Sequence, residues 1–171
     1  EFHHLGEESH GIHAYNQGSK LVIDNCRIEA AGINVFIGDN PPQGETTLYY
    51  PWEDVVVKRC NLAKPRKWQE GHASYADLAW IVKNWFEIKC ATRVLAENNT
   101  MEQNWEKSQT GIAVLFTPRG NDVTDVTFRR NILRNTRGFF NINNTDKVLT
   151  RVLVEDNLCI EQDKGNFSHQ S

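Results

Sequence analysis

WIVKNWFEIKCATRVLAENNTMEQNWEKSQTGIAVLFTP, residues 80–118, contains three short runs in which apolar and polar side chains alternate. The runs are Trp80–Lys89, Arg93–Ala96 and Gly111–Thr117, and residues typical of turns (Asn, Thr, Gln and Gly) separate them. None of the runs has the period of about 3.6 residues that marks a long amphipathic helix. This part of the chain is therefore predicted to form β-strands.

The middle run opens a segment, Arg93–Met101, that has four counterparts elsewhere in the chain: Lys20–Ile28, Asp54–Leu62, Asp125–Leu133 and Arg151–Cys159. Every copy begins with a charged residue followed by Val or Leu. The fourth position is mostly Val, Ile or Phe, two polar residues follow, the seventh is Asn or Cys, and the ninth is apolar. Repetition of this kind indicates one supersecondary unit stacked on itself.

A second repeated element, a glycine followed by a mostly apolar run, precedes copies of the charged segment. Its copies are GIHAY from Gly11, GINVF from Gly32, GIAVLF from Gly111 and GFFNI from Gly138. The steps from Gly11 to Gly32 and from Gly111 to Gly138 are 21 and 27 residues. In a repeat protein these runs are equivalent strands of successive units.

The two elements together predict an all-β parallel solenoid, a β-helix of about five to seven turns. A unit of two or three short strands cannot bury its apolar face alone, whereas units stacked at strand spacing enclose a continuous apolar interior. Equivalent residues then form ladders, and the seventh template position is predicted to be one, at an inward turn: Cys26, Cys60, Asn99, Asn131 and Asn157. The alternative is a β-sandwich of scattered short strands.

The chain of 171 residues is expected to form one domain, residues 1–171, with loops protruding at 38–52 and 63–79. Its net charge of −3 and its lack of long single-sign runs argue against nucleic acid or an anionic membrane as a partner. No signal peptide or membrane-span pattern opens the chain, so the sequence leaves its localisation open. The segment before Gly11 is polar and lacks a capping helix. This favours a solenoid truncated at its N-terminus, whose uncapped ends are available for self-association.

The cysteines and histidines do not predict a metal site. Cys26, Cys60, Cys90 and Cys159 have no C-x-x-C spacing, which argues against structural zinc. Cys26 and Cys60 share a template column and are expected to be buried free thiols, with a disulfide between them as the alternative. His3, His4, His10 and His13 crowd the N-terminal segment, but their spacing matches no defined site, so we expect solvated side chains.

The first loop, GDNPPQGETTLYYPW, contains prolines and glycines that prevent regular structure. It carries three aromatic residues, Tyr49, Tyr50 and Trp52. Loops on a rigid scaffold often hold binding residues, so these rings are candidates for stacking on sugars. The alternative is that they fold back over the solenoid.

The second loop, AKPRKWQEGHASYADLA, combines basic and aromatic residues. Lys64, Arg66 and Trp68 are its candidate ligand-binding residues, because Lys and Arg can pair with the carboxylates of an acidic polysaccharide. The alternative is an ordinary solvated loop in which Trp68 covers the core.

Alternation in Trp80–Lys89 places Lys83, Trp85, Glu87 and Lys89 on one face, predicted to point outward. A lysine with a shifted pKa can act as a general base, so Lys83 and Glu87 are candidate catalytic residues and Trp85 a candidate sugar-binding residue. Charge pairs on an outer sheet give the same pattern and are the alternative. Trp105 lies in the turn before Gly111 and is a further candidate for a ligand groove.

Three phrases resemble a bacterial family of right-handed parallel β-helix proteins that belongs to the pectate-lyase-like superfamily. They are IEAAGINVFIGD, the Lys64–Trp68 segment, and the long block from Trp80 to Thr136. The resemblance spans roughly Gly11 to Ile160 and implies a right-handed solenoid. Family members have further N-terminal turns, which agrees with truncation, and an acidic residue where this chain has Ile33.

The superfamily resemblance implies an association with polysaccharides, a secreted or cell-surface location, and Ca²⁺ as the cofactor to consider. The residues themselves identify no cofactor: there is no compact run of aspartates for calcium. Of the motifs typical of polygalacturonases only Asn144-Thr145-Asp146 occurs, and inverting hydrolysis needs a second carboxylate.

Two hypotheses follow from the sequence. The first is a carbohydrate-associated β-helix, which as an enzyme would be a polysaccharide lyase or glycoside hydrolase using Lys83, Glu87 and Arg93. The second is a non-catalytic solenoid for structure, adhesion or passive glycan binding. The missing motifs favour the second, and the aromatic and basic loops keep the first open.

Overall fold

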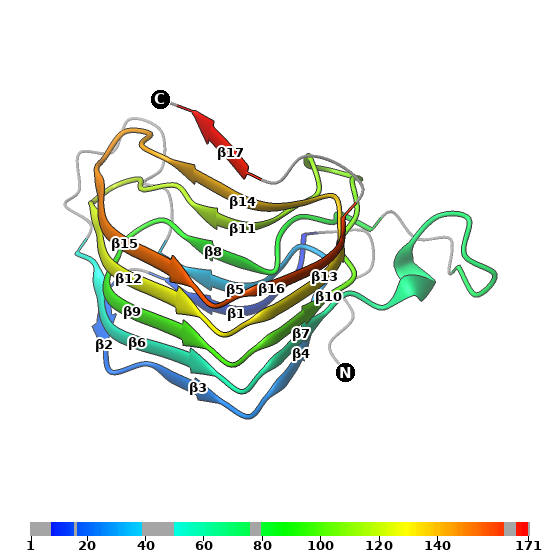
Figure 1. Ribbon diagram of the computed structural model, residues 1–171, viewed down its shortest axis with the longest axis horizontal. Helices are drawn as coiled ribbons and strands as arrows, with labels where there is room; N and C mark the ends of the chain where they lie inside the picture. Colours follow the sequence, from blue (N-terminus) through cyan, green and yellow to red (C-terminus); the bar gives the residue numbers. More distant parts are fainter. Residues whose placement is uncertain (1–7, 16, 39–49, 76–79, 163–166, 171) are drawn as a thin grey trace.

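The computed structural model describes residues 8–15, 17–38, 50–75, 80–162 and 167–170. Within these residues the chain forms three parallel β-sheets and no α-helix (Figure 1). Their strands are, in sheet A, β1 (His10–Ala14), β5 (Ile33–Ile37), β8 (Phe86–Ile88), β11 (Ile112–Phe116), β14 (Gly138–Asn143) and β17 (Phe167–Gln170); in sheet B, β2 (Gly18–Ser19), β3 (Val22–Asp24), β6 (Trp52–Lys58), β9 (Ala91–Glu97), β12 (Val123–Arg129) and β15 (Leu149–Glu155); and in sheet C, β4 (Arg27–Glu29), β7 (Asn61–Ala63), β10 (Thr100–Glu102), β13 (Ile132–Thr136) and β16 (Leu158–Gln162).

The chain visits the sheets in a fixed order. Each strand of the five-stranded sheet C follows a strand of sheet B and precedes a strand of sheet A. Every described strand pair is parallel, and each later round of the chain adds one strand to the same edge of each sheet, whereas the first round gives sheet B two short strands, β2 and β3, that both pair with β6 (Figure 1). The prediction of an all-β chain built from stacked parallel strands is confirmed, and the sandwich alternative is wrong.

The five charged segments align in the predicted register. Their second positions lie opposite one another along sheet B: Val55 pairs with Val94, Val94 with Val126, and Val126 with Val152. The first three of these are buried, and all four contribute to one apolar core with the fourth and ninth positions. Since a slip of one residue would turn this set outward, burial of the valines fixes the register.

The seventh template position forms the predicted ladder. The Oδ1 of Asn99 accepts the backbone N–H of Cys60 at 2.9 Å, and the Oδ1 of Asn131 accepts the N–H of Asn99 at 2.9 Å. The Oδ1 of Asn157 accepts the backbone N–H of Asn131 at 2.9 Å. Each side-chain N–H₂ also donates to a carbonyl of the preceding round, as Asn99 does to Val57. A buried turn between sheets B and C is thereby hydrogen-bonded along the stack.

Two template positions adopt a left-handed backbone in every copy. They are the first, with φ between 52° and 60° (Lys20, Asp54, Arg93, Asp125, Arg151), and the sixth, with φ of 54° or 55° (Asn25, Arg59, Asn98, Arg130, Asp156). This conformation costs an L-residue about 1–2 kcal/mol, so the sequence accepts strain at a bend that every round needs. In the sequence, these bends can be recognised by the polar residues that occupy both positions in every copy.

The glycine-led runs are equivalent strands, but not all of their glycines align. Gly32 and Gly111 are equivalent, because Val35 and Val114 both lie opposite Phe86, whereas Gly11 and Gly138 are out of step with them. Ile112 lies opposite Gly138, and Ile12 lies opposite Val35. Aligning every glycine would misplace the Gly138 run by one residue and the Gly11 run by two. The third strand of sheet A, β8, has no leading glycine at all. The apolar side chains, such as the buried Val114 opposite Phe140, set the register instead.

The two predicted loops are shorter than expected within the described residues. Trp52 already belongs to β6 and Ala63 to β7. The described part of the second insertion contains a 3₁₀ turn, Arg66–Trp68, and Trp68 packs on Trp80 with ring centroids 4.8 Å apart. None of the described residues forms a helix long and apolar enough to cross a membrane.

Candidate functional site

The three predicted catalytic residues do not converge. Glu87 lies in β8 of sheet A, and Lys83 lies just before that strand. Arg93 lies in β9 of sheet B. The Nζ of Lys83 is 2.5 Å from the Oε2 of Glu8, a contact with the N-terminal segment that the sequence did not suggest. The lyase hypothesis, which needs these groups in one cleft, loses its proposed constellation.

Glu87 and Lys89 form an ion pair that is almost fully covered, contrary to the predicted solvated face. The Nζ of Lys89 is 2.6 Å from the Oε1 of Glu87, and the two side chains are 9% and 6% exposed. Asn84 donates to the other oxygen of Glu87 at 3.1 Å, and Lys89 donates to the Oγ1 of Thr117 at 2.6 Å. A charge in a covered site needs such partners. Alternation placed Glu87 and Lys89 on one face correctly, but it did not predict their burial.

Arg93 is exposed but fully engaged. Its Nε lies 2.6 Å from the Oδ1 of Asp54, and its Nη2 lies 2.8 Å from the Oε2 of Glu53. The hydrogen bonds to these two carboxylates raise the pKa of Arg93. A guanidinium held in this way lacks the freedom expected of a catalytic base.

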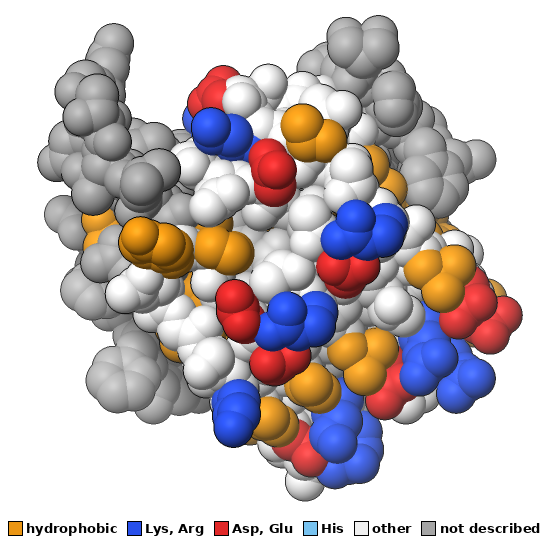
Figure 2. Space-filling model, turned by 90° about the vertical axis from the view of Figure 1, so that its left-hand side faces the viewer, with side chains coloured by type: hydrophobic (Ala, Val, Ile, Leu, Met, Phe, Trp, Pro, Cys, Tyr) orange, Lys and Arg blue, Asp and Glu red, His pale blue; other side chains and the backbone are white. Residues whose placement is uncertain are grey.

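The charges of sheet B alternate in sign along the stack. The first template position runs Lys20, Asp54, Arg93, Asp125, Arg151, and the fifth runs Asp24, Lys58, Glu97, Arg129, Glu155. Neighbours in these columns form ion pairs, such as Arg151 with Asp125 at 2.5 Å and Arg129 with Glu97 at 3.0 Å. Figure 2 shows basic and acidic side chains interleaved on one face of the molecule. The alternation was visible in the aligned copies.

Lys64 was predicted to be a surface residue that binds a ligand, but it is completely buried. Its Nζ donates to the carbonyls of Ala30, Ala31 and Gly32 at 2.9, 2.9 and 2.7 Å, and to the Oδ1 of Asn34 at 3.0 Å. Burial lowers the pKa of the Lys64 amine well below its usual value. Through these hydrogen bonds Lys64 stabilises the turn between sheets C and A.

The predicted sugar-binding aromatics divide into buried and exposed residues. Trp85 is fully buried in the main core, contrary to the prediction, and Trp68 is buried with Trp80, as in the alternative for that loop. Trp105 is half-buried beside this second cluster. Arg66 is exposed.

Near β6 three aromatic residues keep accessible surface. Tyr50 is 58% exposed and Tyr15 47% exposed. The half-buried Trp52 donates its indole N–H to the carbonyl of Tyr15 at 3.3 Å, so its ring joins the two segments. The ring also lies against Gly18, where a Cβ would approach it to 2.3 Å. We call Tyr15, Tyr50 and Trp52 the aromatic corner. Tyr49 lies outside the described residues.

All four cysteines are free thiols. Cys60 is buried as predicted, whereas Cys26 is exposed because it belongs to the first strand round of the ladder. Burial raises the pKa of the Cys60 thiol, and burial raises that of Cys90 to about 11. High thiol pKa values mean little thiolate at neutral pH, so these two cysteines are poor nucleophiles.

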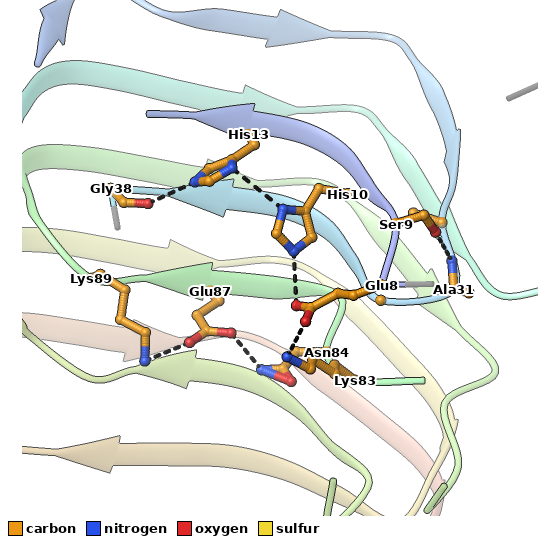
Figure 3. Close-up of polar contacts among 12 residues, drawn as sticks. Glu8, Ser9, His10, His13, Ala31, Gly38, Lys83, Asn84, Glu87 and Lys89 are labelled. Carbon is orange, nitrogen blue, oxygen red and sulfur yellow. Dashed lines mark hydrogen bonds and ion pairs between the residues drawn. The ribbon is translucent and has the colours of Figure 1, made fainter. Parts of the chain in front are cut away.

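Two histidines of the N-terminal strand interact closely (Figure 3). The Nδ1 atoms of His10 and His13 are 3.4 Å apart. The Nε2 of His10 is 2.9 Å from the Oε1 of Glu8, and the Nε2 of His13 is 3.2 Å from the carbonyl oxygen of Gly38. The sequence drew attention to these histidines but not to their pairing. Among the described residues, no three His, Cys, Asp or Glu side chains form a group that could hold a metal ion.

Comparisons of this chain with models of protein families, with curated proteins and with solved structures return no significant match.

Proposed function

We propose that the three sheets are the walls of a right-handed parallel β-helix, and that this β-helix is a non-catalytic scaffold. The observation that carries the proposal is the state of the three candidate catalytic side chains. Lys83 and Glu87 lie on one sheet and Arg93 on another, and each is held in an ion pair. A general base must reach the substrate proton with its own lone pair, and these pairs oppose that.

The rest of the outer surface supports the same proposal. The alternating columns of sheet B neutralise their charges within the protein and leave no one-signed stripe to attract a polyanion. Lys64, a basic residue of the second loop, is buried and donates its hydrogen bonds to backbone carbonyls, so its amine does not face a ligand. What remains is a rigid stack whose polar groups stabilise the fold itself.

An assay for β-elimination tests this proposal. The full chain is incubated with a panel of uronate polysaccharides, with Ca²⁺ and then with chelator, and the ultraviolet absorbance of the unsaturated product is followed. We expect no product. Product formation that disappears in Lys83→Ala or Arg93→Ala, with folding retained, would overturn the proposal in favour of a polysaccharide lyase. Reducing ends released without the unsaturated product would point to a glycoside hydrolase instead.

A second candidate function, passive polysaccharide binding, is favoured by the aromatic corner. Exposed aromatic rings are costly to leave in water and often mark a contact surface. Tyr15 and Tyr50 are exposed, and Trp52 joins its own segment to that of Tyr15 through its hydrogen bond to the Tyr15 carbonyl. A ring held as that of Trp52 is can stack on a sugar face without ordering a loop on binding.

Affinity electrophoresis in gels containing single polysaccharides tests this second function. Retardation of the wild-type chain should be lost in Tyr15→Ala and Tyr50→Ala. The matched control is Leu153→Ala, which removes a 47% exposed apolar side chain from β15, at the other side of sheet B. Equal mobility of the wild type in all gels, or equal loss in the control, would exclude the aromatic corner as a sugar-binding surface.

A further inference from the structure

The outer face of sheet B carries a mostly apolar row of side chains between its two charged columns. The second and fourth template positions contribute to the core in all five copies, so alternation places the first, third and fifth positions on the outer face. The third positions lie opposite one another from round to round. We call this row the outer stripe, and its members are Val22, Val56, Leu95, Thr127 and Leu153.

The outer stripe keeps accessible surface along the stack. Val22 is 60% exposed and Leu153 47% exposed at its two ends, and the three residues between them are half-buried beside their neighbours in the row. Figure 2 shows hydrophobic side chains among the interleaved basic and acidic ones on one face of the molecule. A contiguous apolar row rimmed by polar groups is typical of a surface that contacts a partner.

The two columns that flank the outer stripe carry opposite charges in every round, and the signs reverse from each round to the next. The first round has Lys20 on one side of the stripe and Asp24 on the other. The following rounds have, in the same order, Asp54 and Lys58, Arg93 and Glu97, Asp125 and Arg129, and Arg151 and Glu155. A polyanion or a polycation would meet as many like charges as opposite ones on this face. The surface therefore fits a partner whose own charges alternate.

A second copy of this chain has the required pattern. A two-fold axis that runs along the stack, in front of the outer stripe, brings two copies of sheet B face to face with their rounds level. The first template position of each round then meets the fifth position of the same round in the second copy. Arg93 faces Glu97 and Asp125 faces Arg129, and the signs are opposite in all five rounds. A two-fold interface needs such a self-complementary patch.

Other arrangements of the two faces bring like charges together. A shift of one copy by one round places Lys20 opposite Lys58 of the second copy. A two-fold axis along the middle strand, β9, places Asp54 opposite Asp125. Like charges that face each other across an interface oppose the wrong arrangement. The charged columns thus select one register for the pair of sheets.

The outer face of sheet B is large enough for a specific contact. Its longer strands, β6, β9, β12 and β15, have seven residues each. At about 3.3 Å per residue and about 4.8 Å between strands, five rounds cover about 550 Å². Two such faces together bury about 1,100 Å², which is close to the lower limit of about 1,000 Å² for a specific interface.

We propose that sheet B is a dimer interface, through which two copies of this chain pack face to face around a two-fold axis parallel to the stack. The outer stripe forms the apolar centre of the interface, with Leu95 meeting Leu95 of the second copy in the middle round. The charged columns on both sides form ion pairs between the copies. The interface does not depend on the proposed scaffold function.

Sedimentation velocity of the full chain over a range of concentrations tests the dimer. We expect the wild type to approach twice the mass of one chain as its concentration rises. Leu95→Lys places two like charges at the centre and should raise the dissociation constant of the dimer at least about 100-fold. The matched control is Ile132→Lys, at a 38% exposed position of β13 in sheet C, which should dimerise as the wild type does.

A charge exchange tests the arrangement of the two copies. Arg93→Glu makes both flanking positions of the middle round acidic, and Glu97→Arg makes both basic, so each variant alone should stay monomeric. In an equimolar mixture the acidic pair of one variant faces the basic pair of the other on both sides of the axis, and dimers should form again. Circular dichroism of each variant verifies that it is folded.

Three outcomes would overturn the proposal. The first is a wild-type chain that stays monomeric at its highest soluble concentration. The second is a Leu95→Lys variant that associates as strongly as the wild type, and growth beyond the dimer in both proteins would then indicate stacking through the ends of the solenoid. The third is a mixture of folded Arg93→Glu and Glu97→Arg chains that remains monomeric.

Discussion

Lys64 carries its charge into the interior because four acceptors converge on its Nζ: three consecutive carbonyls and the Asn34 amide oxygen. A turn that exposes its carbonyls inward needs a donor, and a long ammonium side chain supplies three N–H groups at once. The cost of burying that charge is offset only while all partners remain in place.

Lys64→Met keeps an unbranched apolar side chain, one atom shorter, and removes the charge and the donors. The three carbonyls then lose their partner in a dry site, and we expect the free energy of unfolding to fall by about 3–5 kcal/mol. Urea denaturation followed by circular dichroism measures the change. Lys67→Met, at an exposed position nearby, is the matched control and should change stability little. Equal stability of both variants would show that the turn does not depend on the amine.

The ladder at the seventh template position changes from Asn to Cys at residue 60. The Sγ of Cys60 lies 3.6 Å from the carbonyl oxygen of Ile23. The equivalent carbonyl in the next round, that of Val57, accepts a hydrogen bond from the side-chain N–H₂ of Asn99. Cys60→Asn should extend the ladder by one round, since Asn is of similar volume and its N–H₂ would also meet the Oδ1 of Asn99. We expect a gain of about 1 kcal/mol in unfolding free energy.

Thermal denaturation of Cys60→Asn against the wild type measures this gain. Cys90→Asn is the control, because Cys90 is equally buried but lies outside the ladder, where a new amide has no column of partners. It should lower the melting temperature. A fall in both variants would mean that the geometry at residue 60 does not accept the asparagine.

At the scale of the strand, the alternating columns tie stability to pH. The hydrogen bonds from Arg151 lower the pKa of Asp125 from 3.8 to about 2. A carboxyl whose pKa is depressed in the folded state contributes stability at pH values above its unfolded pKa. That contribution disappears as the pH falls through the folded pKa. The pair therefore stabilises the fold above about pH 4 and loses its effect between about pH 4 and pH 2.

Arg151→Ala isolates this contribution. Below about pH 2 the variant and the wild type should have similar melting temperatures, and the wild type should gain more than the variant as the pH rises to about 4. Because the pair is exposed, added salt should reduce the difference. Melting curves at a series of pH values and two salt concentrations test this. A melting-temperature difference between the two proteins that does not change with pH would contradict the contribution assigned to the Arg151–Asp125 pair.

At the scale of the whole molecule, stability should vary along the stack. The inward side chains of β9 and β12, such as Val94 and Val126, are buried, whereas the inward Val152 and Val154 of β15 are only half-buried. In a stack each round contacts only its neighbours, so rounds with a smaller buried area open more readily.

Hydrogen exchange measures this variation directly. Backbone amides of β9 and β12 should exchange most slowly, near the rate set by global unfolding, and those of β15 and β16 considerably faster. The comparison is internal to one sample, so it needs no variant. Uniform protection of all four strands would show instead that the stack unfolds as a single cooperative unit.

Prediction from sequence was most reliable at the template positions that have the same environment in successive rounds. The second, fourth, seventh and ninth template positions are buried in the middle rounds, as Val94, Ala96, Asn99 and Met101 show. It was less reliable where polar side chains meet partners from distant rounds. Lys64, Glu87 and Lys89 have the composition of a solvated surface, and contacts from far along the chain cover and pair them.

The sequence by itself determined the repeating strand, its inward positions and the order in which copies stack, because apolar burial at period two leaves a pattern that five copies reinforce. Only the tertiary structure decided the register of the glycine-led strands, the burial of Lys64 and Trp85, and the pairing of His10 with His13. These depend on distances between segments that are remote in sequence. Side chains of the same type can be solvated or paired at such places, and local pattern does not distinguish the two.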